Sequence, residues 1–114
     1  MNDEKIQSFT KQLDHYLDIL NKFTHWIKEK IKESKDDVSA ACNDYLKVLG
    51  LVATAHAWIK VLEVSFKDYD NNKNFYEDKI QTANFYFNRV LPRAESYFKS
   101  AITGSNYIMD FKFN

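Results

Sequence analysis

The three histidines are the side chains in this 114-residue sequence best suited to hold a metal ion or move a proton. Helical di-iron sites use Glu-x-x-His pairs that project inward from two helices, and no Glu precedes any of these histidines by three residues. His15 and His25 have acidic residues nearby, so we interpret both as surface residues. His56 lies among apolar residues, and we interpret it as a buried structural histidine. The sequence predicts no metal site.

The one cysteine, Cys42, has no base at helical spacing to activate it as a nucleophile, so we interpret it as a small buried apolar residue. The sequence also lacks a glycine-rich phosphate loop, a G-x-S-x-G motif and a paired-cysteine motif. Two acidic pairs, at 36–37 and 77–78, fall where helices are expected to begin and are interpreted as caps. We therefore predict no catalytic and no cofactor-binding residue.

Two arginines four residues apart, Arg89 and Arg93, bracket Pro92 next to a group of aromatic residues. Arginine can bind carboxylates or phosphates through two parallel hydrogen bonds, so a partner contact is one interpretation. Ion pairs with acids of a neighbouring helix are the alternative. We predict a partner interface at Phe85, Tyr86, Arg89, Arg93 and Tyr97, and we expect charge reversal at either arginine to weaken it.

The composition predicts one helical domain over residues 1–114. Hydrophobic residues make up 45% of the chain and charged residues 28%, which is typical of a globular protein, while two Gly and one Pro are too few for a turn-rich β fold. The 16 basic and 16 acidic residues cancel, so we expect no nucleic-acid partner. The single cysteine and the polar N-terminus favour a cytoplasmic protein. Charged residues interrupt the apolar stretch 46–64, so we expect no membrane span.

Apolar spacing predicts three long helices, at about 3–33, 37–69 and 75–103, and a short tail helix at 105–113. The first carries one apolar stripe from Ile6 to Ile31. Ser34 followed by Asp37, or Asp36 alone, would cap the second helix, and Asn74 followed by Glu77 would form a capping box for the third. The third helix has a core row of Tyr76, Ile80, Ala83, Phe87, Val90, Ala94, Tyr97 and Ala101.

The second helix is apolar on more than one side, which predicts two neighbours. One expected row consists of Val38, Cys42, Tyr45, Leu49, Val52, His56, Ile59 and Phe66, and Leu46, Ala53, Ala57 and Val61 lie beside it. Small residues around Gly50 would let another backbone approach closely. Pro92 should kink the third helix, and Gly104 should end it. Short connections then predict an antiparallel up-down-up three-helix bundle.

Three stretches in order resemble the C-terminal helical extension of a subgroup of acyl-CoA dehydrogenases. Residues 83–93, with the string Phe-Tyr-Phe-x-Arg-Val-Leu-Pro, and the preceding residues 75–79 are the most specific. Residues 24–27 resemble the first helix of that extension and residues 45–53 its second. The resemblance extends roughly from Leu13 to Phe113, although the chain is richer in Asn, Lys and Tyr than the extension usually is.

The resemblance implies that the flavin adenine dinucleotide (FAD) site, the acyl-CoA pocket and the catalytic glutamate belong to a separate dehydrogenase core. None of their residues maps onto this sequence. The chain would be a stand-alone or split-off C-terminal domain, a non-catalytic accessory in fatty acid metabolism that assembles with such a core. The alternative is an independent interaction module, most simply a homodimer that pairs the aromatic face of the third helix.

Overall fold

The computed structural model describes residues 2–103, with side chains from residue 4 onward, and every regular element in this range is helical. The all-α class predicted from the scarcity of Gly and Pro is therefore confirmed for the described residues. The predicted tail helix at 105–113 and the predicted stop at Gly104 lie outside them. The Cα atoms extend over 61 × 25 × 16 Å, so the molecule is long and thin.

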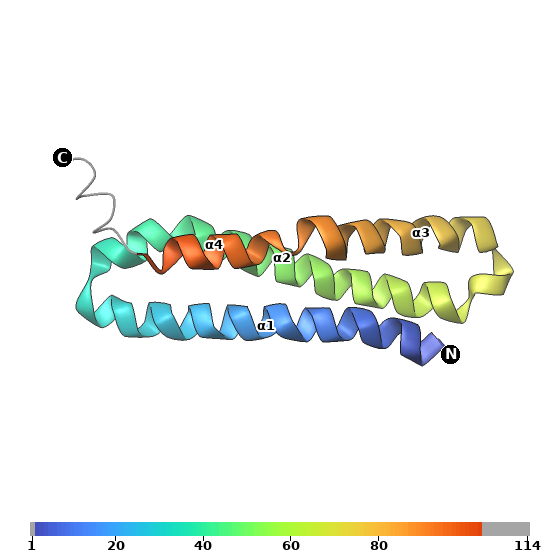
Figure 1. The fold of residues 1–114 in the computed structure, drawn as a ribbon, viewed down its shortest axis with the longest axis horizontal. Coiled ribbons are helices and arrows are strands. Elements are labelled where there is room, and N and C mark those ends of the chain that lie inside the picture. Colours follow the sequence, from blue (N-terminus) through green and yellow to red (C-terminus); the bar gives the residue numbers. More distant parts are fainter. Residues whose placement is uncertain (1, 104–114) are drawn as a thin grey trace.

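The first two helices run antiparallel with a single residue between them (Figure 1). Helix α1 spans Asn2–Glu33 and α2 spans Lys35–Lys67. Ser34 has an extended backbone, and its hydroxyl accepts a hydrogen bond from the N–H of Asp37 at 3.2 Å. This cap satisfies one of the free amides at the start of α2, and it confirms the first of the two capping alternatives read from the sequence.

The return run along α2 is divided into several helical segments. A 3-10 turn, η1 (Tyr69–Asn71), leads into α3 (Lys73–Phe85), a π-helical segment η2 (Tyr86–Val90) and α4 (Arg93–Ala101). The predicted capping box at Asn74 is wrong, because the Asn72 side chain caps α3 by accepting from the N–H of Phe75 at 3.3 Å. The Glu77 carboxylate instead accepts from the Tyr69 hydroxyl at 3.0 Å.

The break between α3 and α4 lies next to Pro92, which has no N–H to continue the helical ladder. The N–H of Leu91 donates to the carbonyl of Tyr86 at 2.8 Å, a bond that spans five residues and widens the helix locally. Of the three consecutive aromatic residues there, Tyr86 and Phe87 are buried and Phe85 is 61% exposed. Consecutive residues of a helix face directions about 100° apart, so one of the three lies outside the core.

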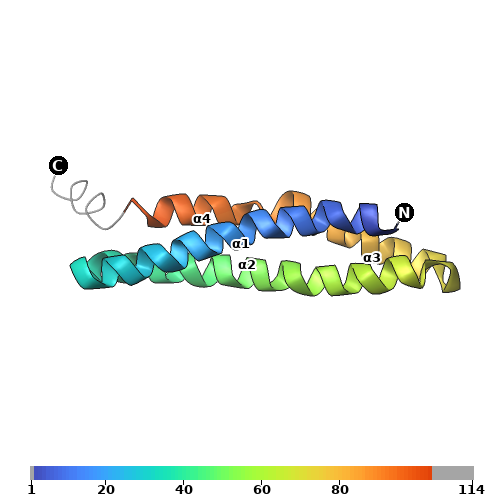
Figure 2. The same ribbon diagram turned by 90° about the horizontal axis from the view of Figure 1, so that it is seen from below.

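Helix α2 is the central element and contacts α1, α3 and α4 (Figure 1). When the molecule is turned by 90° about its long axis, α2 lies along one side and α1 and α4 lie along the other (Figure 2). Residues from the predicted rows of the first and third helices join the buried core, with Phe23 and Phe87 among the most deeply buried. Leu91 is fully buried where the prediction had its neighbour Val90, which is only partly buried. Ile31, at the end of the predicted stripe of α1, is exposed.

The predicted row of the second helix is partly wrong, because the buried side is rotated away from it. Cys42, Leu49 and His56 are exposed, whereas the residue just before each of them is buried. One residue corresponds to about 100° around a helix, so the core of α2 is displaced by roughly that angle in its middle. The buried apolar residues of α2 are Ala41, Val48, Val52, Ala55, Ile59, Leu62 and Phe66. We call these seven the covered face.

Candidate functional site

The most unusual surface of the molecule is the side of α2 that points away from the core. It consists of the exposed residues Leu46, Leu49, Gly50, Ala53, Ala57, Val61 and Val64, which we call the open face. Leu46 and Val64 are 18 residues apart, which is five helical turns, so they lie on one line along the helix about 27 Å long. Contiguous exposed apolar residues of this kind mark binding surfaces in soluble proteins.

The middle of the open face is nearly flat, because Gly50, Ala53 and Ala57 have little or no side chain. Apart from the two adjoining residues and the backbone of α2 itself, no described atom lies within 4 Å of the position that a Cβ on Gly50 would occupy. The sequence predicted that another backbone would approach closely here, and among the described residues none does. The small residues leave a surface that a further helix could reach at short range.

A hollow of about 380 Å³ borders the open face on the side of α4. It is lined by Lys47, Gly50, Leu51, Thr54, Tyr86, Arg93 and Tyr97. The Tyr86 hydroxyl donates to the carbonyl of Leu51 and so ties η2 to α2. Burial raises the pKa of the Tyr86 phenol, against a smaller lowering from the Thr54 hydroxyl. The Lys47 ammonium lies 5.0 Å from the centre of the Tyr97 ring, within cation–π range.

A second hollow, of about 420 Å³, continues along the same side of α2 towards α3. It is lined by Lys60, Val61, Val64, Ser65, Phe75, Tyr76 and Lys79. Phe75 is 50% exposed, and the Lys79 ammonium lies 5.2 Å from the centre of its ring. The two hollows share their α2 wall with the open face, so apolar surface extends from α2 onto the third run of the chain.

The charges around these two hollows are all positive. Lys47 and Arg93 line the first, Lys60 and Lys79 line the second, and no Asp or Glu lines either. Among the described residues, none of the four forms an ion pair; the ion pairs there join His15 to Glu95, Lys22 to Asp18 and Lys30 to Glu33. On the side of α3 and α4, the apolar surface is therefore edged by cations that have no carboxylate partner in this part of the chain.

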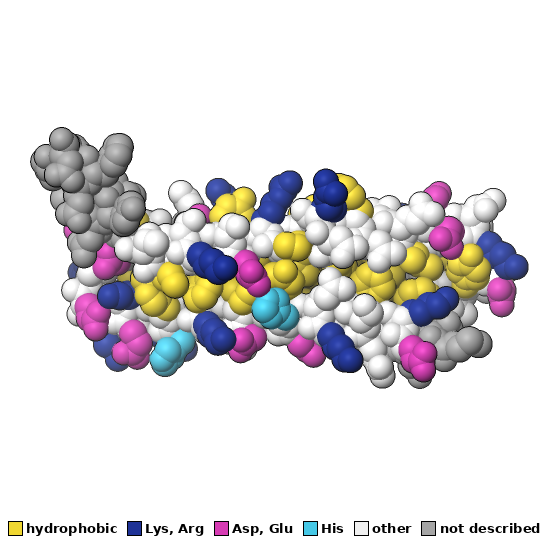
Figure 3. All heavy atoms as spheres, in the orientation of Figure 1, with side chains coloured by type: hydrophobic (Ala, Val, Ile, Leu, Met, Phe, Trp, Pro, Cys, Tyr) yellow, Lys and Arg dark blue, Asp and Glu magenta, His cyan; other side chains and the backbone are white. Residues whose placement is uncertain are grey.

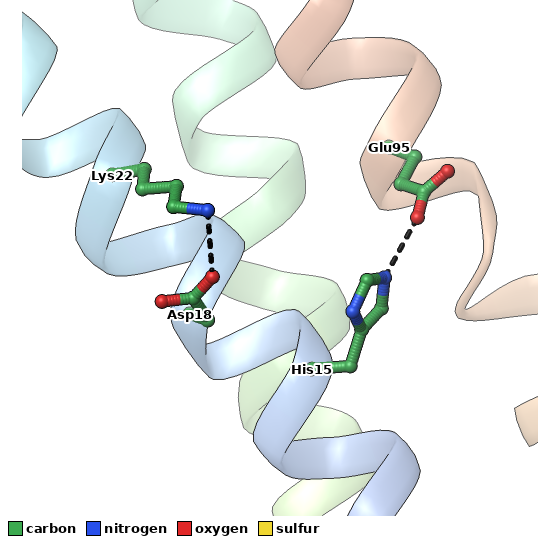
Figure 4. Close-up of polar contacts among 4 residues, drawn as sticks. All are labelled: His15, Asp18, Lys22 and Glu95. Atoms are coloured by element: carbon green, nitrogen blue, oxygen red, sulfur yellow. Dashed lines mark hydrogen bonds and ion pairs between the residues drawn. The ribbon is translucent and has the colours of Figure 1, made fainter.

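On the side of the molecule opposite the open face, α1 and α4 contact each other and cover α2. Apolar side chains follow the seam between α1 and the α3–α4 run, with charged residues on both sides of it (Figure 3). His15 of α1 and Glu95 of α4 point toward each other across the seam, with Nε2 and Oε1 2.7 Å apart (Figure 4). A carboxylate can only accept, so the imidazole donates. This hydrogen bond lowers the pKa of Glu95, and burial followed by the Glu95 charge raises the pKa of Tyr16.

The residues predicted as a partner interface are divided by the structure. Phe85, Arg89 and Arg93 are exposed, Tyr97 is half-buried, and Tyr86 is buried with its hydroxyl bonded inside the molecule. The ion pairs expected between the arginines and a neighbouring helix do not form within the described residues. The interface as a whole stays a prediction, and Tyr86, Arg93 and Tyr97 are the members that line the hollow beside the open face.

The residues considered for chemistry are not gathered into a reactive site. His25, Cys42 and His56 are all exposed. In the described part of the chain, no three His, Cys, Asp or Glu residues are placed to hold a metal ion. A third hollow, of about 650 Å³, is lined by two lysines, Asp70 and Glu77, so its charges balance. The hydrogen bond to Glu77 raises the pKa of the Tyr69 phenol there, which disfavours a tyrosinate base.

Gly50 does not form a glycine-rich turn at the start of a helix, which is one common way to bind the pyrophosphate of a dinucleotide. It lies in the middle of α2, where backbone amides are used by the helix itself. The expectation that the chain itself binds no cofactor stays a prediction.

Helix α2 is long and apolar enough to cross a bilayer by length and composition, with a mean hydropathy of 1.4 in its most apolar window. A helix of a protein core can pass the same test, but only 33% of that window is buried in this molecule. The high hydropathy of α2 thus comes from both its covered face and its open face, and only the covered face packs inside the domain. The expectation that the chain does not span a membrane stays a prediction.

A family model described as acetyl-CoA dehydrogenase C-terminal like matches residues 1–112. It covers all four α-helices described above, the open face and the cations that border it. The search of curated proteins and the search of solved structures returned no match.

Proposed function

Because the chain belongs to the family of acetyl-CoA dehydrogenase C-terminal-like domains, we propose that it is a non-catalytic assembly domain that packs on the core of an acyl-CoA dehydrogenase. FAD and the acyl-CoA substrate would bind to that core. The domain would contribute to fatty acid metabolism in the cytoplasm through its partner. Its working unit would be the elongated up-down-up bundle, bent next to Pro92.

The open face of α2 is the observation that carries this proposal. A helix that is apolar on two sides is expected to be covered on both, and within the described residues α2 is covered on one of them only. Burial of apolar surface contributes about 25 cal/mol per Å², so covering Leu46, Leu49, Val61 and Val64 would favour association. An assembly domain gains this contribution when it meets its core.

The proposal is tested by co-expressing the chain with an acyl-CoA dehydrogenase core encoded in the same genome. We expect one complex in size-exclusion chromatography with light scattering, with a mass equal to whole numbers of both chains. A dehydrogenase that already carries its own C-terminal extension serves as the control and should not bind, because its docking site is filled. Failure of the purified core and chain to associate at tens of micromolar would sink the proposal.

A second candidate function is an independent homodimer that pairs the third helical run. The exposure of Phe75 and Phe85, at 50% and 61%, favours it. Light scattering across a wide concentration range separates the two functions. A homodimer predicts a mass that doubles as concentration rises without any core present, whereas a strictly monomeric mass would rule it out.

A further inference from the structure

We propose that the open face binds a helix of the protein partner whose apolar side is edged by carboxylates. This inference deepens the proposed function, on which it rests only for the identity of the partner as a dehydrogenase core. It adds the secondary structure and the charge of the segment that docks. Three observations carry it: the shape of the face, the sign of the charges beside it, and the poor fit of a second copy of this chain.

The shape fits a helix. The open face is a straight strip about 27 Å long, with small side chains at Gly50, Ala53 and Ala57 in the middle and larger ones, Leu46 and Val64, at the ends. Small residues let two helix axes come close, and helices pack with their ridges in each other's grooves at 8–10 Å. The two hollows on the α3–α4 side provide space for side chains of the docked helix.

The charges specify the partner further. The cations of the two hollows, Lys47, Arg93, Lys60 and Lys79, lie along one edge of the strip or within it, and they have no carboxylate partner among the described residues. Complementary charge steers association and selects among partners, while like charges across an interface cost several kcal/mol. A docked helix with Glu or Asp along its edges would supply the missing carboxylates.

A second copy of the chain does not satisfy these charges. In an antiparallel pair of open faces, the edge with Lys47 and Arg93 would lie against the same edge of the other copy. In a parallel pair, Lys60 of one copy would lie against Lys60 of the other, because it lies within the strip. Either arrangement places like charges together, so a partner of different sequence and opposite charge fits better.

The test uses two synthetic helical peptides of about 18 residues, long enough to match the strip. Both carry the same leucine stripe, and the edges of that stripe are glutamate in one peptide and lysine in the other. Fluorescence anisotropy of the labelled peptides measures binding to the full chain. We expect the glutamate-edged peptide to bind at least about tenfold more tightly, with an advantage that shrinks as salt is raised. Equal binding of the two peptides, or no binding at about 100 µM, would overturn the inference.

Two variants locate the binding on the open face. Ala57→Glu places a carboxylate in the middle of the strip and should weaken the glutamate-edged peptide at least about tenfold. Ala40→Glu makes the same exchange at an exposed position of α2 outside the face, and it should leave binding unchanged. Equal effects of the two variants would contradict the inference. Circular dichroism should show that both variants remain folded, since neither residue is in the core.

A charge-swapped variant provides the sharpest result. Lys60→Glu combined with Arg93→Glu should invert the preference, so that the lysine-edged peptide becomes the tighter one. An unchanged preference would mean that the cations do not select the partner and would overturn that part of the inference.

A basic, apolar surface can also bind anionic lipid, so vesicles of phosphatidylserine and phosphatidylcholine form a third arm. Vesicle binding that is lost in Ala57→Glu, without binding of the glutamate-edged peptide, would overturn the inference in favour of a membrane surface. The peptide and core experiments are independent. Peptide binding without core binding would sink only the proposed function, and core binding that survives Ala57→Glu would sink only this inference.

Discussion

The covered and open faces of α2 are built from similar residues and differ in what lies against them. Val48, Ala55 and Leu62 are completely buried under α1 and the α3–α4 run, while Leu46, Ala57 and Val64 lie on the other side of the same helix and are exposed. Hydrophobicity alone therefore does not tell which face joins the core. The difference supports the proposal that α2 makes a second set of contacts, beyond those within the described residues.

The largest expected difference between the faces is the cost of truncating a leucine. Leu62→Ala leaves a cavity in the covered face and should lower the free energy of unfolding by about 2–5 kcal/mol. Leu46→Ala removes a side chain that is 63% exposed and should change it by no more than about 0.5 kcal/mol. Urea denaturation of the two variants measures both values. Similar losses would mean that Leu46 is covered in solution.

Replacing an alanine by leucine should also destabilise the covered face more than the open face, by a smaller amount. Ala55→Leu overpacks the covered face and should cost about 1–3 kcal/mol. Ala57→Leu adds the same atoms on the open face and should be within about 0.5 kcal/mol of the natural chain. Thermal melts followed by circular dichroism compare them. A destabilised Ala57→Leu variant would show that something within the chain already packs there.

Gly50→Ala tests whether the middle of the open face is free space. Glycine inside a helix costs about 0.5–1 kcal/mol relative to alanine. Apart from the adjoining residues and the backbone of α2, the added Cβ would meet no described atom within 4 Å. We expect the variant to unfold at a higher urea concentration. Destabilisation instead would reveal a close neighbour of the backbone at this point.

The smallest expected effect concerns the pair that closes the covered side, His15 and Glu95. The hydrogen bond from His15 lowers the pKa of Glu95 in the folded state. The pair therefore stabilises the fold at pH values above 4.5, the ordinary pKa of the carboxyl group, and this stabilisation is lost as pH falls through the pKa of Glu95 in the folded protein. Both side chains are substantially exposed, so the contribution is at most about 1 kcal/mol.

Glu95→Gln should therefore be slightly less stable than the natural chain near neutral pH, and the difference should vanish in acid. Urea titrations of both proteins between neutral pH and the acid range measure this difference. Glu33→Gln, which changes an exposed carboxylate at the end of α1, is the control. A difference that grows as pH falls would contradict the assigned direction of the pKa shift.

Much of the fold could be predicted because its signals are local. The amphipathic stripe of α1 and the Ser34 cap depend on residues within a few positions of one another. The prediction at Asn74 failed because three asparagines lie within four residues of the turn, at 71, 72 and 74, and pattern alone does not choose among possible caps.

The errors at Cys42 and His56 have a different cause. Both lie on a helix that is apolar on several sides, where spacing permits more than one core face. The sequence showed the second apolar face of α2 and its small residues, which is the signal for the candidate site. It did not show that this face would be exposed, or that the lysines of α2 and α3 would border it together with Arg93 of α4.

The sequence by itself determined the helical class, the approximate helix ends, the absence of recognisable catalytic motifs and the likeness to a dehydrogenase C-terminal domain. Only the tertiary structure decided which side of α2 enters the core, and it brought His15 to Glu95 and Lys47 to Tyr97 from distant parts of the chain. The physical reason is that periodicity fixes the angle between residues on one helix, whereas the packing of α1 and α4 against α2 decides which of its apolar faces loses contact with water.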